Sequence, residues 1–521
     1  MKNIHKLVIV MLVGLFVSCD DKLDINTDPN YPAEINAGLA LTSAEANLAT
    51  VVGGELTSLG GFFAQYHTQA PSASQFENID SNNLNTAYAN TPWTQLYAGA
   101  LTDLQYVSAQ SEQSGDTATL LIAEALRAYT YQLLVDLFGD VPYTEALQGT
   151  SGNITPAVDS GQAIYADLIV KLDAAVAAYD ANPTDAAYPS QDVIYGGDID
   201  LWKQFINTLK LKIYLRMAYT PQANPAAVNA LITENNFLTE EAAFTTFANV
   251  VNKTNPFYGT FMSTGGSGLG AVNHVASNTL HDFYVANNDP RLGTVYRRSP
   301  VTGLFPSIAQ GSGNTYNNTA SAYARPNIRP TTPVFLMSTV ESNFMQAEAL
   351  IRYAGGTGAK AKYDAGILAS LTIYQRYFYT DTNLDPGDDE LSDEDASPWT
   401  TAETATYFQT LTGAGGVYEY QPTGAVESDV RQVIVQKWAS LPYINTIEAW
   451  IESTRTKFPE VVPEGTQDYS IGNRIPSLIT VLTGTNVPSI LFYPDDEANR
   501  NPNITQHANL LENVWWDQKP E

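Results

Sequence analysis

The chain has 521 residues, with 26 Lys or Arg against 55 Asp or Glu, so its formal net charge is −29. Its 44 % apolar and 11 % aromatic residues supply a large core and exclude wholesale disorder, and so negative a charge excludes a protein that tracks nucleic-acid phosphates. The single Cys excludes an intrachain disulfide and a cysteine-rich metal site.

The N-terminus predicts a lipoprotein signal peptide over residues 1–18. Lys2 and Lys6 precede an apolar run over residues 7–17, which is shorter than the ~20 residues of a membrane span. The run ends at Cys19, the only Cys of the chain, where a bacterial lipoprotein would be cleaved and acylated. We therefore expect Cys19 to carry lipid, such as palmitate, that anchors the protein. A secreted protein with an unmodified Cys is the alternative.

Residues 19–36 predict an acidic tether. Asp20, Asp21 and Asp24 follow Cys19 closely, and prolines and asparagines continue as a turn-rich stretch. Beyond the tether no second apolar span occurs. We expect residues 37–521 to form a single α-helical domain.

Apolar residues at helical spacing recur through this domain. Three capping-box or N-cap spacings, at Thr42, Ser338 and Asn445, mark helix starts. The strongest helix, 117–138, is apolar on most of its surface and should be central and buried. The predicted helices span residues 42–52, 93–110, 117–138, 164–179, 201–219, 338–353, 363–379, 430–440 and 445–457. Their pairing predicts a mainly α fold of tetratricopeptide-like hairpins, although no 34-residue repeat is visible.

Residues 252–332 differ from the rest. Gly, Asn, Ser and Thr dominate there, which predicts a loop-rich insertion in the helical domain.

Motifs for catalysis or metal binding are mostly absent. The sequence holds no phosphate loop, dinucleotide fingerprint or zinc-protease motif, and its His residues lack metal-ligand spacing. Asp381, Asn383 and Asp385 have the first spacings of a calcium loop, but Pro386 replaces the required Gly and Ser392 the closing Glu. We therefore expect no cofactor and no metal, with calcium at residues 381–395 as the alternative to a solvated loop. A pair of catalytic carboxylates, as in a glycosidase, is also an open alternative, because the chain has 55 Asp or Glu residues.

Aromatic rings in polar loops are the best candidates for ligand contact. A ring offers a flat apolar face to a sugar, and Asn or His can hydrogen-bond its hydroxyls. For each such residue, packing in the core is the commoner alternative. The candidates are Tyr66, His67, Phe76, Asn78, Tyr258, Phe261, His274 and Tyr316.

A series of short motifs then resembles the SusD/RagB-like outer-membrane nutrient-binding lipoproteins, in their divergent SusD-like branch. Each motif is weak alone, but their order extends over nearly the whole chain. They are LDINTDPN at 23–30, WTQLY at 93–97, AEALRA at 123–128, DLFGDVPYTEA at 136–146, WKQF at 202–205, NTLKL at 207–211, DPRL at 289–292, QAEA at 346–349, QKW at 436–438, EAW at 448–450, RT at 455–456 and YP at 493–494. Thr454 and Ile490 stand where members of the family often carry Arg.

The resemblance implies a fold, a location and partners. It implies a binding protein rather than an enzyme, anchored in the outer membrane, facing the cell exterior and covering a SusC-like TonB-dependent transporter. Such a protein captures oligosaccharides in its variable loops and passes them to the transporter, which packs against the helical scaffold. Alternatives are a peptide-binding member of the family, a purely structural lid and, less favoured, a surface glycoside hydrolase.

Overall fold

Helices dominate the computed structural model, which describes residues 36–264, 268–316, 318–378 and 398–520, so the predicted mainly α fold is confirmed. The helices are α2 (Ala37–Gly53), α3 (Glu55–Phe63), α4 (Glu77–Asp80), α5 (Asn90–Thr94), α6 (Thr102–Ser114), α7 (Thr117–Phe138), α8 (Gly161–Ala181), α9 (Ile199–Arg216), α10 (Pro225–Glu234), α11 (Asn278–Ala286), α12 (Leu292–Val295), α13 (Thr339–Tyr353), α14 (Ala359–Tyr377), α15 (Thr401–Thr412), α16 (Val426–Ser440), α17 (Thr446–Thr456) and α18 (Asp495–Ala498). The strands are β1 (His67–Gln69), β2 (Val141–Pro142), β3 (Val158–Asp159), β4 (Ala242–Phe244), β5 (His274–Ala276), β6 (Tyr296–Arg297), β7 (Arg325–Pro326) and β8 (Val334–Met337).

Helix α7 lies at the centre of the first group of helices. Asp116 caps it by accepting a hydrogen bond from the Thr119 amide, and Gly139, with φ of +78°, ends it. Apolar residues cover nearly all its sides, so it packs against α6, α8 and α9 at once. The predicted bounds and buried position of this helix are confirmed.

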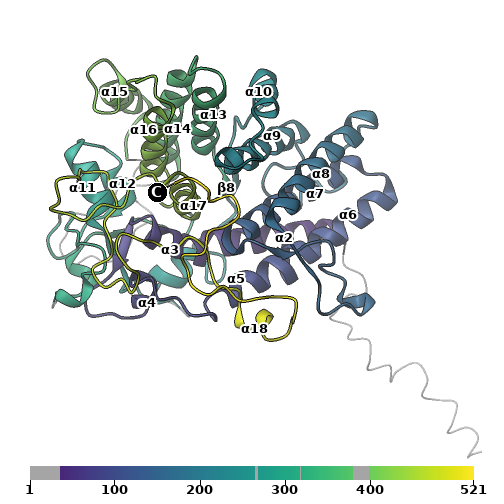
Figure 1. The fold of residues 1–521 in the computed structure, drawn as a ribbon, viewed down its shortest axis with the longest axis horizontal. Coiled ribbons are helices and arrows are strands. Elements are labelled where there is room, and N and C mark those ends of the chain that lie inside the picture. The colour runs from purple at the N-terminus through teal and green to yellow at the C-terminus, as the bar shows by residue number, and fades with distance from the viewer. Residues whose placement is uncertain (1–35, 265–267, 317, 379–397, 521) are drawn as a thin grey trace, which may run out of the picture.

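A second group of helical hairpins follows later in the chain. Helix α13 packs against α14, α16, α9 and α10, and α17 packs against α3 from the N-terminal part of the chain. Ser338 begins α13 with the predicted capping box. Figure 1 shows α6, α7 and α8 on the right, the second group at the top, and the segment with α11 and α12 on the left.

Some helix boundaries differ from the prediction. Helix α2 begins earlier than predicted, because the side chain of Asn36, not Thr42, accepts the capping hydrogen bond from Gly38 N at 2.7 Å. The predicted helix 93–110 is interrupted by a π-helical stretch, Gln95–Leu101. Helices α3, α10, α11 and α15 were not predicted, since Gly, Asn and Thr weaken their apolar periodicity.

The strands form antiparallel pairs that join distant parts of the chain. Strand β1 pairs with β5, with Gln69 opposite His274, and β4 pairs with β8. The other pairs are β2 with β3 and β6 with β7. The pair β1–β5 joins the loop-rich segment 252–332 to the N-terminal part of the chain, β6–β7 lies within the segment, and β4–β8 pairs the residues that flank it.

Ion pairs are buried where α7, α9 and α17 meet. Arg216 contacts Asp136 at 3.0 Å, Glu448 at 2.6 Å and Glu452, and all four side chains are nearly inaccessible. Arg455 adds a pair with Glu348 at 2.7 Å. Acids and bases from distant helices thus neutralise one another inside the core. We call these five side chains together with Arg216 the core ion network.

The signal peptide, Cys19, most of the acidic tether and the acidic segment 381–395 lie outside the described residues. Within the described part of the chain, no helix combines the length and apolarity that crossing a bilayer requires.

Candidate ligand-binding surfaces

Several of the predicted ligand-contacting rings, although distant in the sequence, meet in space, but most of them form core. Pairing of β1 with β5 brings His67 next to His274, with ring centroids 4.6 Å apart. Phe76 and Phe261 pack around them, with centroids 5.1 and 5.2 Å from the His274 ring. His67, Phe261 and His274 expose 0, 4 and 1 % of their surface. A ring whose faces are covered by other side chains cannot stack on an incoming sugar.

Both histidines are neutral structural groups. His67 donates from Nε2 to the Ser58 carbonyl at 3.0 Å, and Ser58 Oγ lies 2.9 Å from His274 Nε2. Burial lowers the pKa of His67 to about 3 and lowers the pKa of His274 well below its usual value. The prediction that His67 and His274 contact a ligand is therefore corrected to a role in packing.

Tyr66 is likewise a core residue and not a ligand contact. Its ring is fully buried, and its hydroxyl donates to the Trp438 carbonyl at 2.6 Å. Burial of the phenol raises the pKa of Tyr66 well above its usual value. The prediction that Tyr66 and Phe261 contact a ligand is therefore wrong. Both rings are buried instead, because removing an apolar ring from water stabilises the folded chain.

Four predicted residues keep accessible surface. Phe76 and Tyr258 are half-buried at the edge of the ring cluster, whereas Asn78 and Tyr316 are exposed. Among the aromatic side chains that the structure describes, Tyr316 is the one classed as exposed, at 40 %. Its ring leans edge-on against Tyr323, with centroids 5.9 Å apart.

Polar residues flank Tyr316 along the chain. Asn314 Nδ2 donates to Glu77 Oε1 at 2.9 Å, and Ser72 Oγ donates to the Asn318 carbonyl at 3.1 Å. These bonds hold the segment after Ser312 against the segment after Gln69. We call the surface formed by Ser72, Glu77, Asn78, Asn314, Tyr316 and Asn318 the loop surface.

The buried carboxylate of Asp80 joins the two segments that carry the loop surface. Asp80 Oδ2 accepts from Thr68 Oγ1 at 2.7 Å and from the Gln69 amide at 3.1 Å, while Asp80 Oδ1 accepts from Gln310 Nε2. Burial raises the pKa of Asp80 to about 6, although these hydrogen bonds oppose the rise. Asp80 therefore sets the relative position of the two segments that carry the loop surface.

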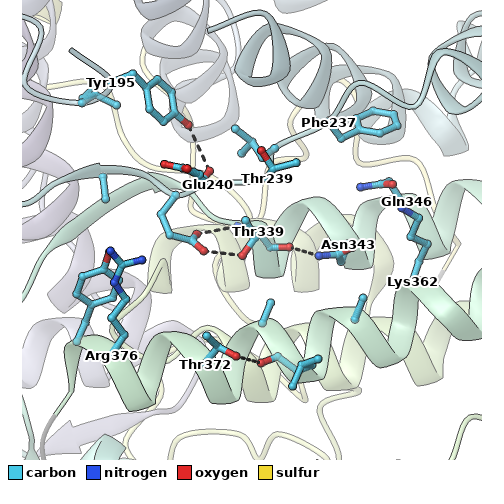
Figure 2. Close-up of a pocket in the computed structure, with 18 of the residues that line it drawn as sticks. Tyr195, Phe237, Thr239, Glu240, Thr339, Asn343, Gln346, Lys362, Thr372 and Arg376 are labelled. Atoms are coloured by element: carbon cyan, nitrogen blue, oxygen red, sulfur yellow. Dashed lines mark hydrogen bonds between the residues drawn. The ribbon is translucent and has the colours of Figure 1, made fainter. Parts of the chain in front are cut away.

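A separate groove of about 880 Å³ lies between β4, α13 and α14. Figure 2 shows Tyr195, Glu240 and Phe237 on one wall, and Lys362, Thr372 and Arg376 on the facing helix α14. Acids and aromatic rings thus face two cations across the groove. Sequence reasoning missed this site, because its residues come from segments more than a hundred positions apart.

The floor of the groove holds a carboxylate with altered acidity. Glu241 accepts hydrogen bonds from the Thr339 amide at 2.8 Å and from Thr339 Oγ1 at 2.5 Å. Burial raises the pKa of Glu241 to about 7, against the lowering effect of those bonds. Near neutral pH this group can therefore be charged or uncharged. In the described residues no cluster of three or more His, Cys, Asp or Glu could hold a metal ion.

Comparison with known proteins identifies the family. The model of the SusD-like_2 family, described as starch-binding and associating with the outer membrane, matches residues 29–477. Searching the curated proteins gave no match. A SusD/RagB family protein from Bacteroides thetaiotaomicron is 20 % identical with a TM-score of 0.71, covering 94 % of this chain and 100 % of its own.

Two further structures are similar over most of the chain. A chitin-binding protein is 23 % identical with a TM-score of 0.67, and covers 92 % of this chain and 100 % of its own. A SusD homologue from Bacteroides uniformis is 22 % identical with a TM-score of 0.69, and covers 92 % of this chain and 99 % of its own. These likenesses show the same fold, and the family match extends from the tether almost to the end of the chain. The chain therefore belongs to the SusD-like family.

Proposed function

We propose that this protein binds glycans at the cell surface without catalysis. The observation that carries the proposal is the exposed ring of Tyr316 on a member of the SusD-like family, in a segment that a hydrogen bond between Asn314 and Glu77 holds in place. An exposed ring is the group that stacks on the C–H face of a sugar, and Asn side chains both donate to and accept from hydroxyls. The chitin-binding relative supports the same class of ligand.

The location and partners follow from the sequence resemblance. Lipid on Cys19 anchors the chain in the outer membrane, and the acidic tether places the helical domain outside the cell. The helical hairpins pack against a SusC-like TonB-dependent transporter, to which bound oligosaccharides pass from the loop surface. The outer-membrane association in the family description supports this arrangement.

Calorimetric titration with maltoheptaose and chitohexaose tests the proposal. Tyr316→Ala should weaken binding by about tenfold, because it removes the stacking face. Tyr316→Phe is the matched control that keeps the ring and should bind nearly as well as the parent. Equal affinity of the Ala variant and the parent for a bound glycan would remove the loop surface from the proposal. Release of shorter sugars during prolonged incubation would contradict a role without catalysis.

The groove of Figure 2 favours a second candidate, the binding of a peptide. A peptide carries both charges at its ends and in its side chains. The groove presents Glu240 opposite Lys362 and Arg376, and Glu241 also lines it. A zwitterionic peptide can therefore pair with both walls. Titration with Gly-Asp-Lys-Gly and with maltoheptaose separates the two functions. An Arg376→Gln variant should weaken peptide binding only, whereas Lys171→Gln, an exposed lysine outside the groove, should change neither.

A further inference from the structure

A second, smaller pocket lies beneath the C-terminal part of the chain, apart from both surfaces described so far. It has a volume of about 250 Å³ and lies at the C-terminal end of α17. Hydroxyl and amide side chains form half of its lining, and the charged residues Lys457, Glu460 and Arg474 contribute a quarter. The polar uncharged lining residues are Ser453, Thr454, Thr485, Asn486, Ser489 and Asn513.

Arg474 is a buried cation with hydrogen-bonding capacity to spare. Its side chain is 2 % exposed, and its Nε donates to the Pro459 carbonyl at 3.1 Å and its Nη1 to the Phe63 carbonyl at 3.3 Å. Neither partner carries charge. Among the described residues, Arg474 Nη2 has no hydrogen-bond partner and the guanidinium has no ion pair with a carboxylate. Burial without such a pair lowers the pKa of Arg474 to about 10.

The other charges of the pocket are neutralised locally. Lys457 pairs with Asp517 at 2.9 Å, and Glu460 pairs with Arg431 at 2.7 Å. The two cations Lys457 and Arg474 and the one carboxylate Glu460 leave the pocket lining with a net positive charge, although Glu460 also attracts Arg474. The net charge of −29 weakens the attraction of the pocket for an anion only slightly, because exposed charges beyond about 8 Å are screened at physiological salt.

The backbone holds the guanidinium in place. Arg474 N donates to the Glu460 carbonyl at 2.8 Å, and the Arg474 carbonyl accepts from Val462 N at 2.8 Å. The side chains of Thr485, Asn486 and Ser489 line the opening, and none of the three has a hydrogen-bond partner within the described residues. The cationic donor of Arg474 thus shares the pocket lining with hydroxyl and amide groups that make no hydrogen bond within the described residues.

We propose that this pocket binds the carboxylate of an acidic sugar, a hexuronate unit. A guanidinium recognises a carboxylate through charge-assisted hydrogen bonds, and hydroxyl and amide side chains complement the ring hydroxyls of the same ligand. The volume is below that of most drug-sized sites, so a single sugar ring fits better than a chain. The site would extend the ligands of the protein from neutral to acidic glycans.

Calorimetric titration of the purified protein with sodium D-glucuronate, D-glucose and triglycine tests the inference. Glucuronate should bind at least about tenfold more tightly than glucose, because only glucuronate satisfies Arg474. Arg474→Met should abolish that preference. Asn486→Asp is nearly isosteric and partly exposed, so it should fold normally and weaken glucuronate binding severalfold by charge repulsion.

Arg500→Met is the matched control, since Arg500 is 78 % exposed and lies outside the pocket, and it should leave glucuronate binding unchanged. Equal binding of glucuronate and glucose, or an Asn486→Asp variant that binds glucuronate like the parent, would overturn the inference. Triglycine binding as tight as glucuronate binding would also overturn it, in favour of peptide C-termini. If glucuronate does not bind preferentially but maltoheptaose binds tightly, only the proposal for the pocket is wrong. The proposal that the loop surface binds glycans is tested separately.

Discussion

At the scale of single residues, burial separates rings that look alike in the sequence. Tyr66 and Tyr316 both lie in polar loops, yet Tyr66 is inaccessible and Tyr316 is 40 % exposed. The difference comes from neighbours distant in sequence, since the Tyr66 hydroxyl meets the Trp438 carbonyl across 372 positions. Most rings are buried because removing an aromatic face from water is strongly favourable. A ring left in water is therefore the unusual case, and Tyr316 stands out for that reason.

Burial of His67 predicts a pH dependence of stability. Burial lowers the pKa of His67 to about 3 in the folded chain, from its ordinary value of 6.5. Below pH 6.5 the unfolded state thus binds more protons than the folded state, so the stability contributed by this group is complete above pH 6.5 and is lost toward pH 3. Between pH 6.5 and pH 5 the loss for His67 is about 2 kcal/mol.

His67→Gln should therefore flatten the dependence of the unfolding free energy on pH between 6.5 and 5, measured by urea denaturation. The slope is the readout, because altered packing shifts the whole curve without changing its slope. Identical slopes for His67→Gln and the parent would show that His67 titrates normally in the folded chain.

At the scale of elements, two capping boxes differ in their surroundings. Ser338 begins α13 inside the protein, and Thr400 begins α15 at the surface. In both boxes the N-cap hydroxyl accepts from the amide of a Glu three positions later, at 3.2 Å. The Thr400 box was missed in the sequence, because the apolar periodicity of α15 is weak.

Ser338→Ala should lower the unfolding free energy by about 2 kcal/mol, and Thr400→Ala by about 0.5–1 kcal/mol. An amide left without a partner inside the protein costs more than one that water can reach. Urea denaturation of both variants measures the difference. Equal decreases in unfolding free energy would show that a buried helix cap stabilises this fold no more than an exposed one.

The core ion network joins helices that are remote in the sequence. Arg216→Met should destabilise the protein by about 3–5 kcal/mol, because Asp136, Glu448 and Glu452 would be left buried with less compensating charge. Lys360→Met, which removes an exposed pair with Asp364, should cost less than about 0.5 kcal/mol. Chemical denaturation distinguishes the two, and comparable losses would argue against a structural role for the network.

At the scale of the whole molecule, the net charge affects how the protein can attach to a membrane. A net charge of −29 disfavours binding of the chain to anionic membrane surfaces, which fits our proposal that lipid on Cys19 anchors it. Cys19→Ser should move the protein from the membrane pellet to the soluble fraction. Immunoblots of the fractions measure this, and antibody labelling of whole cells reports surface display. Membrane retention of the Ser variant would point to attachment by another route.

The sequence by itself determined the class of fold, the position of α7, the caps at Ser338 and Asn445, and the family resemblance that the family model confirms. These features depend on local spacing of apolar and capping residues, which the chain carries within a few turns of helix. The tertiary structure decided which rings reach solvent, where the groove of Figure 2 lies, and which charges are left without a partner. Those properties depend on contacts between segments hundreds of residues apart, such as Arg216 with Glu448 or Arg474 with Phe63, and no local pattern records such contacts.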